Sequence, residues 1–411
     1  MKIYLKSLAS GCTSSLHEVS QYRSTLTKLN YTVTNRIDEA DVIILNTCGF
    51  STDAEENSLN EIDLVAKKYP QKKIIAGGCL LKINPTLFKQ HHNKSSFHPE
   101  KINEILSELE DPRGNSNVDI SSDVQHLHHD DLKLLGVKFK LFYFTQKYFY
   151  SFIKKTHLSN AYLDHYFKSI AINKDSVIIV AARGCLGHCT YCAIKKSRGT
   201  LQSTPWEIIK PQIQKAILNN KTDIILRAED LGAWGQDIKS NICFLLKNIL
   251  THFPQVTITI PFFEPSWIIT FKHELIPLLA NPQFICFYTP LHSASSKVLN
   301  KMGRSYSSTE VIKIIRHIKK INPTLILKTN ILHSFPTEDR KDFIESLKLA
   351  WSFDFTLPIL FTPRPGTLAF NFPTSITPTE RKIRHILASL FLWPLNLMKL
   401  ITNYGLYAFR K

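Results

Sequence analysis

The sequence predicts an α/β protein in which a long connector joins two parallel-sheet domains. Three observations predict this fold class. Short hydrophobic runs alternate with amphipathic stretches over residues 1–90 and again over residues 176–370. The chain of 411 residues is long enough for two or three domains with separate cores. Its composition, 44% hydrophobic and 21% charged, is ordinary for a globular protein.

The first domain, residues 1–90, has the alternation of a doubly wound parallel sheet. Its clearest buried strand is the run Asp-Val-Ile-Ile-Leu at 41–45. The expected elements are strands at 1–8, 41–45 and 73–76 and helices at 15–29 and 52–68. In such a sheet the loops that follow the strands share one edge, and ligands bind there.

The second domain, residues 176–370, repeats a strand and a helix six times. Strands are expected at 176–182, 223–227, 256–260, 284–289, 324–330 and 355–361. This pattern predicts a partial (β/α)6 barrel, and the general rule for barrels puts chemistry at the carboxyl ends of the strands.

Two further segments have their own character. The connector, residues 91–175, contains an aromatic and basic stretch at 141–172 that suits three roles: stacking on bases, lying on a membrane surface, or covering the barrel. The tail, residues 371–411, is helical in pattern. Its apolar run Ile386–Met398 reads as a core or interfacial helix broken near Pro394, and we expect no stable membrane insertion because no uncharged apolar run reaches about 18 residues.

The net charge is +17, from 51 Lys and Arg against 34 Asp and Glu. This balance favours a polyanionic partner such as RNA. The alternative is compositional drift, since the charge is spread along the chain without a dense basic run. No leader segment is evident, so we expect a cytoplasmic, reducing location.

The most informative feature is a C-x3-C-x2-C loop formed by Cys185, Cys189 and Cys192. Three thiolates suit a [4Fe–4S] cluster that keeps one iron open to chelate a small molecule. Zinc is a weaker alternative because it prefers four ligands, of which His188 is the only convenient fourth. A disulfide is weaker still in a reducing compartment.

A second triad comes from the first domain. Cys12, Cys48 and Cys79 each follow the carboxyl end of a predicted strand, so they should converge at one edge of the sheet. Flanking glycines permit the close backbone approach that a cluster needs. We predict a second [4Fe–4S] cluster here, again with three protein ligands. The remaining cysteines, Cys243 and Cys286, lie in apolar runs and look like buried structural thiols.

The chain resembles the methylthiotransferase branch of the radical S-adenosylmethionine (SAM) superfamily. The matching segments are Asp-Val-Ile-Ile-Leu-Asn-Thr-Cys-Gly at 41–49, Gly-Gly-Cys at 77–79, Arg-Gly-Cys-Leu-Gly-His-Cys-Thr-Tyr-Cys-Ala-Ile-Lys at 183–195, Ser197-Arg198-Gly199 followed by Ser203, and Phe-Thr-Pro-Arg-Pro-Gly-Thr-Leu-Ala at 361–369. The segment Glu-Asp-Leu-Gly-Ala-Trp-Gly-Gln-Asp at 229–237 is most similar to the archaeal and eukaryotic type, which acts on N6-threonylcarbamoyladenosine in tRNA.

The resemblance implies a flavodoxin-like first domain, a radical SAM barrel, two [4Fe–4S] clusters and SAM. It implies insertion of a methylthio group at an unactivated C–H bond of the modified adenosine, with flavodoxin or ferredoxin as reductant and a monomeric chain. Tyr191 occupies the position whose backbone contacts adenine in the family. The strand ends supply the rest of the expected SAM shell: Glu229, Ser293, Arg304 and Asn330.

Three departures keep other substrates open. The family segment QSGSD reads His-Ser-Ala-Ser-Ser at 292–296, and TDIIVGFPGET reads Thr-Asn-Ile-Leu-His-Ser-Phe-Pro-Thr-Glu-Asp at 329–339. After Ala369 only 42 residues remain, so the tRNA-gripping TRAM domain of the family is expected to be missing. The same chemistry on a protein or peptide side chain or a small metabolite is therefore a second hypothesis. A non-catalytic iron–sulfur protein is a third hypothesis.

Overall fold

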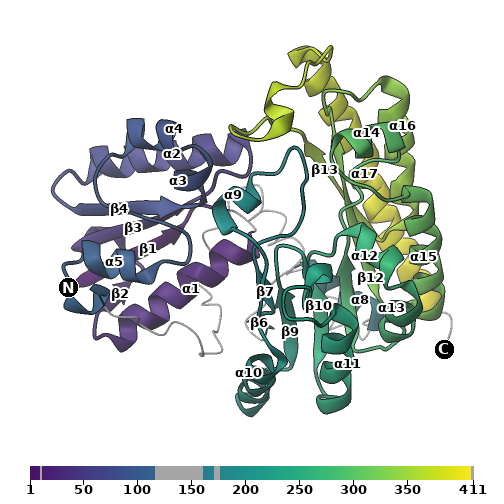
Figure 1. Ribbon diagram of the computed structural model, residues 1–411, viewed down its shortest axis with the longest axis horizontal. Helices are drawn as coiled ribbons and strands as arrows, with labels where there is room; N and C mark the ends of the chain where they lie inside the picture. Colours follow the sequence, from purple (N-terminus) through teal and green to yellow (C-terminus); the bar gives the residue numbers. More distant parts are fainter. Residues whose placement is uncertain (10–11, 116–160, 171–175, 409–411) are drawn as a thin grey trace.

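The computed structural model describes residues 1–9, 12–115, 161–170 and 176–408. Two parallel sheets lie side by side, each with its own helices (Figure 1). The α/β class, with a doubly wound first domain and a partial barrel, is confirmed.

The first sheet is wholly parallel and has the strand order β2-β1-β3-β4-β5. This is the flavodoxin-like order that the resemblance implied. The strands are β1 (Lys2–Ser7), β2 (Thr32–Thr34), β3 (Val42–Thr47), β4 (Lys73–Gly78) and β5 (Ser96–Phe97). The sheet continues past residue 90, because β5 and α5 (Ile102–Glu108), which lie in the predicted connector, complete its edge and its core.

Helices cover both faces of this sheet. Because alternate residues of a strand point to opposite faces, Val42 and Ile44 pack against α1 and α5, while Ile43 and Leu45 pack against α2, α3 and α4. The bounds are α1 (Thr13–Lys28), α2 (Thr52–Lys68), α3 (Cys79–Ile83) and α4 (Pro85–His91), with short 3-10 turns η1 (Ile37–Glu39) and η2 (Pro112–Asn115).

The second sheet has the parallel order β13-β12-β11-β10-β9-β6. Its strands are β6 (Ser176–Val180), β9 (Asp223–Arg227), β10 (Thr257–Ile260), β11 (Phe284–Tyr288), β12 (Ile326–His333) and β13 (Phe355–Leu360). All lie within two or three residues of the expected positions. A small antiparallel pair, β7 (Ala182–Arg183) and β8 (Gln202–Ser203), flanks the loop after β6.

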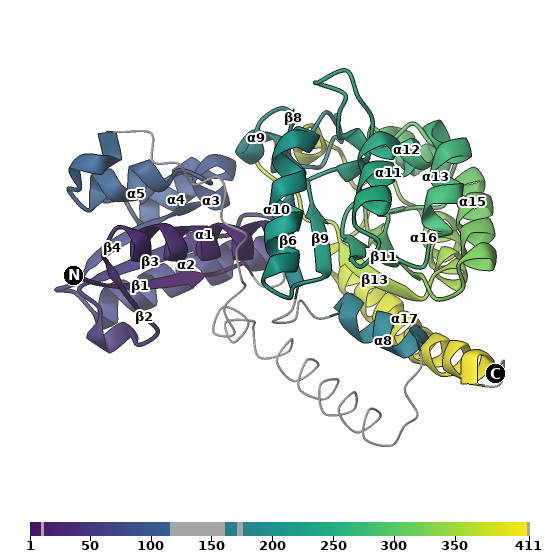
Figure 2. The same cartoon turned by 90° about the horizontal axis from the view of Figure 1, so that it is seen from below.

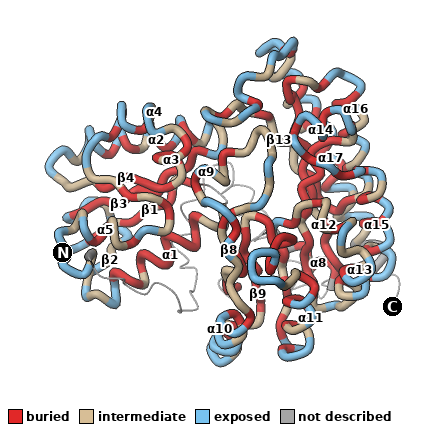
Figure 3. Tube along the Cα trace, viewed as in Figure 1, coloured by how far each residue is buried: buried red, intermediate tan, exposed pale blue. Residues whose placement is uncertain are grey.

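The helices of the barrel pack on the outer face of the curved sheet, where the main hydrophobic core lies (Figures 2 and 3). Val177, Ile224 and Ile258 belong to this core, and so does the buried Cys243. The helices are α9 (Ile194–Arg198), α10 (Trp206–Leu218), α11 (Ile242–His252), α12 (Pro265–Thr270), α13 (Lys272–Leu279), α14 (Ser296–Lys301), α15 (Ser308–Ile321) and α16 (Arg340–Lys348), with 3-10 turns η3 (Leu231–Ala233), η4 (Leu349–Ser352) and η5 (Leu368–Asn371).

The other face of the barrel sheet is partly covered by α8 (Ala161–Ile170). Tyr162 and Tyr166 of α8 pack there with Ile285, the buried Cys286 and Ile326. Of the three roles considered for the aromatic stretch, covering the barrel is therefore the one that residues 161–170 have. The remainder of that stretch lies outside the described residues.

The tail forms one long helix, α17 (Pro378–Ala408), which packs along the edge strand β13. The Asn396 side chain accepts from the N–H of Thr356 at 2.9 Å and donates to its carbonyl at 3.0 Å, so it satisfies the free edge of that strand. The expected break near Pro394 is wrong, because α17 continues through it. A proline removes one helical N–H but need not end a helix that is held by packing.

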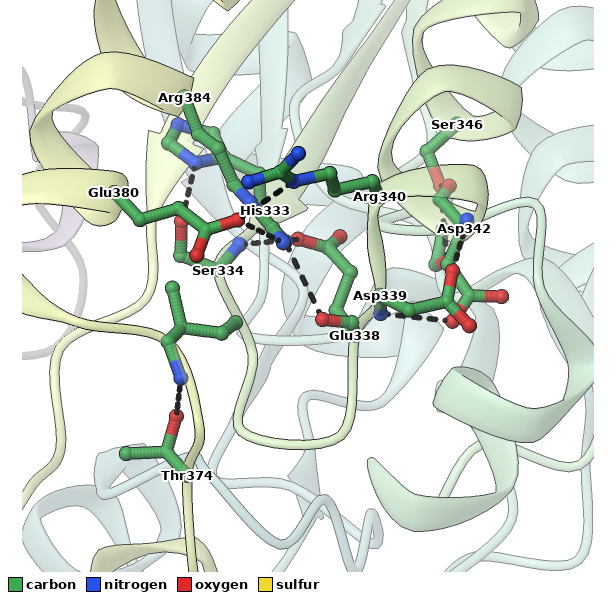
Figure 4. A network of polar contacts seen from close by, with 12 residues as sticks. His333, Ser334, Glu338, Asp339, Arg340, Asp342, Ser346, Thr374, Glu380 and Arg384 are labelled. Atoms are coloured by element: carbon green, nitrogen blue, oxygen red, sulfur yellow. Dashed lines mark hydrogen bonds and ion pairs between the residues drawn. The ribbon is translucent and has the colours of Figure 1, made fainter.

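A polar network docks the first half of α17 beside the end of β12 (Figure 4). The Arg384 guanidinium lies 2.9 Å from Glu338, and the ring nitrogens of His333 and His385 lie 3.1 Å apart. Burial, helped by His385 and by nearby arginines, lowers the pKa of His333 to about 3. Burial raises the pKa of Glu338 to about 7, although Ser334 and Arg384 donate to it.

We predict that His333 makes the fold sensitive to acid. The unfolded chain binds a proton at His333 below its usual pKa of about 6.5, whereas the folded chain resists it down to about 3. Stability therefore falls as the pH decreases through this window, by about 2 kcal/mol between pH 7 and pH 5. In urea unfolding, the free energy of unfolding of His333→Asn should therefore fall by about 2 kcal/mol less than that of the wild type between pH 7 and pH 5.

Glu338 titrates in both proteins, so its contribution cancels in the comparison. The matched control is His317→Asn on the exposed side of α15, which should lose as much stability as the wild type. Equal acid sensitivity of His333→Asn and the wild type would contradict the prediction.

Candidate active site

The first cysteine triad lies on the loop between β7 and α9 and comprises Cys185, Cys189 and Cys192. The N–H of Cys185 donates to the carbonyl of Gly199 at 3.2 Å, which closes the base of the loop. Two more backbone N–H groups donate to sulfur: that of Gly187 at 3.2 Å from Cys185 Sγ, and that of Ile194 at 3.4 Å from Cys192 Sγ. Donors of this kind tune the sulfurs of iron–sulfur clusters.

Gly184 makes the start of this loop possible. Its φ is +71°, and a Cβ there would lie 2.0 Å from the carbonyl oxygen of Thr200. Within the loop, burial raises the pKa of Cys185 to about 11 and that of Cys192 to about 12. Cys189 and Cys185 both contribute to the shift at Cys192, so the three sulfurs lie close enough for their charges to interact.

The second triad lies at the carboxyl edge of the first sheet and comprises Cys12, Cys48 and Cys79. Cys12 is the N-cap of α1, Cys48 follows β3, and Cys79 opens α3. Burial, then the charges of Cys12 and Cys79, raise the pKa of Cys48 to about 12. The three strand ends therefore bring the three thiols together.

The donor set of each triad, three cysteine thiols on neighbouring loops, suits an iron–sulfur cluster. Across the described part of the chain, no three His, Cys, Asp or Glu side chains are arranged around one metal ion. Zinc would need its sulfurs at about 2.3 Å from a common point. In an iron–sulfur cluster each thiolate binds a different iron, so the sulfurs stand farther apart while remaining neighbours.

Helix α9 connects the two sites. It begins directly after the first triad, packs against α3, and brings Ser197 and Arg198 to Cys79. Burial raises the pKa of Cys79 to about 11, while Arg198 and Ser197 oppose that shift. Lys196 of the same helix donates to the carbonyl of Ile83 at 3.1 Å.

A buried charge network joins the domains beside these triads. Arg198 donates to Glu18 of α1 and, at 3.3 Å, to Glu100. Arg227, at the end of β9, donates to Glu100 at 3.2 Å and to Glu229 at 3.0 Å. Burial alone would raise the pKa of Glu100, but Arg227, Arg183 and Arg198 hold it below its usual value.

A second contact between the domains comes from Arg364, in the loop after β13. Its guanidinium donates to Glu55 Oε2 at 3.1 Å, to the carbonyl of Gly49 at 3.2 Å and to Thr52 Oγ1 at 3.1 Å. Gly49 directly follows Cys48, so a residue of the barrel domain holds the backbone beside a cysteine of the second triad.

Three residues of the expected SAM shell lie close together: Tyr191 in the loop before α9, Arg304 after α14, and Asn330, which lies within β12 and not at its end as expected. Arg304 Nε donates to the Tyr191 hydroxyl at 3.0 Å, and burial keeps the pKa of Tyr191 well above its usual range. The Tyr191 ring meets His292 edge-on at 5.5 Å, and the His292 N–H donates to the carbonyl of Asn330 at 3.0 Å.

Within the described residues, Glu229 Oε2 is a buried atom without a hydrogen-bond partner, and Asn330 Oδ1 and His292 Nδ1 have no partner besides each other. Burial, with Arg304 nearby, keeps the pKa of His292 well below its usual value, so its ring is neutral. Buried polar atoms are nearly always hydrogen-bonded in proteins, so a ligand with polar groups would find acceptors to bind here.

The other two expected shell residues already have hydrogen-bond partners within the protein. Glu229 belongs to the interdomain network, where it also accepts from Ser14 at 3.4 Å. Ser293 is fully buried, and its hydroxyl bonds to Ser346 Oγ at 3.0 Å and to the N–H of Ser295 at 3.1 Å.

The interdomain residues Glu18, Glu100 and Arg227 were missed because no local pattern marks them, and Arg364 was noted only as part of the matching segment 361–369. The strain at two strand ends was also missed. His292 (φ +62°) and Ser334 (φ +60°) both adopt the left-handed conformation that favours glycine. Both lie in the segments that depart from the family pattern, and that departure was the sequence feature that could have indicated the strain.

Comparison with known proteins agrees with this geometry. The model of a family described as "Uncharacterized protein family UPF0004" matches residues 2–97, and that of the "Radical SAM superfamily" matches residues 179–350. The threonylcarbamoyladenosine tRNA methylthiotransferase of Danio rerio is 27% identical over 373 residues, covering 90% of this chain and 62% of that protein. The chain belongs to the radical SAM methylthiotransferase family. SAM and [4Fe–4S] clusters are the cofactors that this membership brings.

A second type of relative is equally similar. The tRNA-2-methylthio-N(6)-dimethylallyladenosine synthase of Thermotoga petrophila is 26% identical over 400 residues, covering 94% of this chain and 80% of that protein. Among solved structures, the radical SAM methyltransferase TsrM of Kitasatospora setae has a TM-score of 0.60 at 12% identity, covering 90% of this chain and 77% of TsrM. The chain spans 57–64% of the length of the vertebrate relatives it matches.

We predict that reconstituted protein binds about eight irons per chain, because each triad fits one [4Fe–4S] cluster. Replacing Cys185, Cys189 and Cys192 together by Ala should leave about four. Cys243→Ala, a buried cysteine outside both triads, should keep the full amount. Iron quantitation decides this, and a triple variant that retained all its iron would refute the assignment of the loop.

We also predict that Arg364 is needed to hold the domains together. Arg364→Met leaves Glu55 buried without a cation, which should lower the free energy of unfolding by about 3–5 kcal/mol. Adding Glu55→Gln should recover part of this loss in urea unfolding. Lys272→Met is the control, since it breaks the exposed pair with Glu310 and should cost less than about 1 kcal/mol. Equal losses at Arg364 and Lys272 would contradict the prediction.

Proposed function

We propose that the chain is a methylthiotransferase that inserts a methylthio group at an unactivated C–H bond of N6-threonylcarbamoyladenosine in tRNA. The observation that carries the proposal is the pairing of two cysteine triads, one at the carboxyl edge of each sheet, with α9 in contact with both. A single triad suffices for radical chemistry on SAM. The second triad is what sulfur insertion requires in addition.

The chain's residues have distinct roles in this proposal. Cys185, Cys189 and Cys192 hold one cluster, and Cys12, Cys48 and Cys79 hold the other. When bound, the clusters and SAM supply the electron, the radical and the methylthio group. The protein holds these groups, orients them and excludes water, which is the usual division of labour in cofactor enzymes.

The barrel strand ends supply a polar surface for SAM. Arg304 is a buried cation only partly balanced by Glu264 at 3.4 Å, so it suits a carboxylate. Glu229 Oε2 is an unpartnered acceptor and Asn330 Oδ1 has no partner besides His292, so both suit amino or hydroxyl donors. Tyr191 presents the backbone next to the last cysteine of its loop. Ser293 remains a weaker candidate, because its hydroxyl is already bonded to Ser346.

The choice of substrate rests on similarity. The vertebrate relatives bear the name threonylcarbamoyladenosine tRNA methylthiotransferase, and the net charge of +17 favours a polyanion. Of the lysines suited to RNA contact in the aromatic stretch, Lys168 is paired with Asp223 at 2.9 Å. Lys147, Lys154 and Lys155 lie outside the described residues. The proposal further includes a flavodoxin or ferredoxin as reductant, a monomeric chain and a cytoplasmic location.

A second candidate keeps the chemistry and changes the substrate to a protein or peptide side chain or a small metabolite. It is favoured by the strained strand ends at His292 and Ser334, since strained backbone gathers at functional sites and here replaces the family's usual segments. A substrate site whose wall differs from the family pattern at His292 and Ser334 suits a substrate other than the modified adenosine.

Nucleoside mass spectrometry tests the proposal. Reduced, reconstituted protein should convert threonylcarbamoyladenosine in tRNA to its methylthio derivative and leave dimethylallyladenosine and unmodified adenosine unchanged. Cys48→Ala should still form 5′-deoxyadenosine but no methylthio product, because the two triads are separate. Cys192→Ala should form neither.

The outcomes separate the candidates. Cleavage of SAM by the wild type without any change in tRNA would favour the peptide or metabolite reading. Absence of SAM cleavage in a protein that holds both clusters would indicate a non-catalytic iron–sulfur protein.

A further inference from the structure

The outer face of α17 exposes a long apolar stripe. We call it the outer stripe, and it consists of Ile383, Ile386, Leu387, Leu390, Phe391, Trp393, Leu397, Met398 and Ile401. Leu390 is 69% exposed and Ile401 60% exposed. The spacing of three and four residues places these side chains on one side of the helix. Contiguous exposed apolar surface of this extent marks an interaction site on a soluble domain.

The opposite face of α17 is tied to the barrel. Arg384 bonds to Glu338, Asn396 bonds to both backbone groups of Thr356, and Leu392 is fully buried. By length and composition, Pro378–Asn403 is apolar enough to cross a membrane, but withdrawing it would leave Glu338 and the edge of β13 without these partners. Because removing one partner of a buried ion pair is costly, the helix stays on the barrel and offers its other side.

A basic cavity opens beside the second half of α17. Its volume is about 320 Å³, and it is lined by Arg316, Lys319 and Lys320 of α15 together with Trp351 and Lys399. Asp354 is the carboxylate in the lining, and it already accepts from Lys319 and from the N–H of Leu327. Four cations therefore face one carboxylate that is already engaged.

The cations of this cavity repel one another. Burial lowers the pKa of Lys399, Asp354 opposes the shift, and Lys319 and Arg316 lower the pKa further. An anion in the cavity would relieve this repulsion. The half-exposed Trp351 beside it is of the residue type that concentrates where membranes meet water.

We propose that the outer stripe and the basic cavity form a peripheral binding surface for an anionic phospholipid bilayer. The stripe enters the boundary between headgroups and acyl chains, as interfacial helices do, and the cavity receives a headgroup phosphate. RNA would neutralise the cations but leave the aliphatic stripe in water. A second copy of the chain would cover the stripe but bring two sets of cations together. The bilayer satisfies both, and the proposal is independent of the proposed catalytic function.

Co-sedimentation with vesicles tests the stripe. Full-length protein should pellet with phosphatidylcholine vesicles that contain phosphatidylglycerol and much less with phosphatidylcholine alone. Replacing Leu390 and Leu397 by Glu should lower the partition coefficient at least about tenfold, because two leucines leave the bilayer and two charges oppose it. The matched control replaces two exposed leucines elsewhere on the chain, Leu64 and Leu218, by Glu. This variant should keep most of the vesicle binding.

A second pair of variants tests the cavity without touching the helix. Replacing Arg316 and Lys320 by Gln should reduce binding to the anionic vesicles about 25-fold, since each cation near the surface contributes about fivefold. The control replaces the exposed Lys239 and Lys247 of the barrel by Gln, which changes the net charge equally. Circular dichroism checks that every variant folds. If the variant of Leu390 and Leu397 does not fold, the variant of Arg316 and Lys320 decides the test.

Several outcomes would overturn the proposal. If the test and control pairs lost vesicle binding equally, the effect would be one of net charge alone. If the wild type did not pellet with anionic vesicles at low salt, there would be no membrane binding to explain. Retention of the protein on vesicles through an alkaline carbonate wash would indicate a spanning helix. Self-association abolished by the leucine variants, without vesicle binding, would make the stripe a contact between copies. Loss of tRNA binding in the cavity pair, without vesicle binding, would make the cavity an RNA site.

Discussion

The relative placement of the two cysteine triads depends on the buried ionic contact between the domains. Arg198 and Arg227 from the barrel meet Glu18 and Glu100 from the first domain, and all four side chains are largely removed from water. Such a contact adds little net stability, since desolvation offsets the attraction. It is nevertheless selective, because any other docking of the domains would leave these charges buried without partners.

The start of α1 concentrates several parts of this contact in two helical turns. Cys12 caps the helix, Ser14 accepts from Arg227 Nε at 2.9 Å, and Leu16 packs against Ile178 and Ile225 on the inner face of the barrel. Glu18 follows one turn later. A cysteine of the second triad, a hydrogen bond, an apolar contact and an ion pair therefore share one rigid segment, so the position of Cys12 is coupled to the docking of the domains.

The strands were predictable from the sequence because their cause is local. The central parts of runs such as 41–45 and 223–227, namely 42–45 and 224–226, are apolar throughout, as strands buried on both faces must be. The cysteines were predictable because parallel strands end at a common edge. The interdomain network was not, since Glu18, Glu100, Arg198 and Arg227 are far apart in sequence and no local pattern shows which of these charges pair. Likewise, β5 and α5 were placed in the connector because a strand of two residues carries no periodic signal.

Helix α17 shows why an apolar pattern alone does not orient a helix. The usual inference places the apolar stripe of a helix against the core and its charges in water. Here Arg384 and Asn396 are buried while Leu390 and Leu397 are exposed, because the barrel offers the helix specific polar partners, Glu338 and the edge of β13. These partners lie about 40 to 50 residues away in sequence, so periodicity cannot reveal them. A helix turned in this way retains its hydrophobic side for a partner outside the chain, and hydrophobic side chains with cations beside them are what a membrane surface requires.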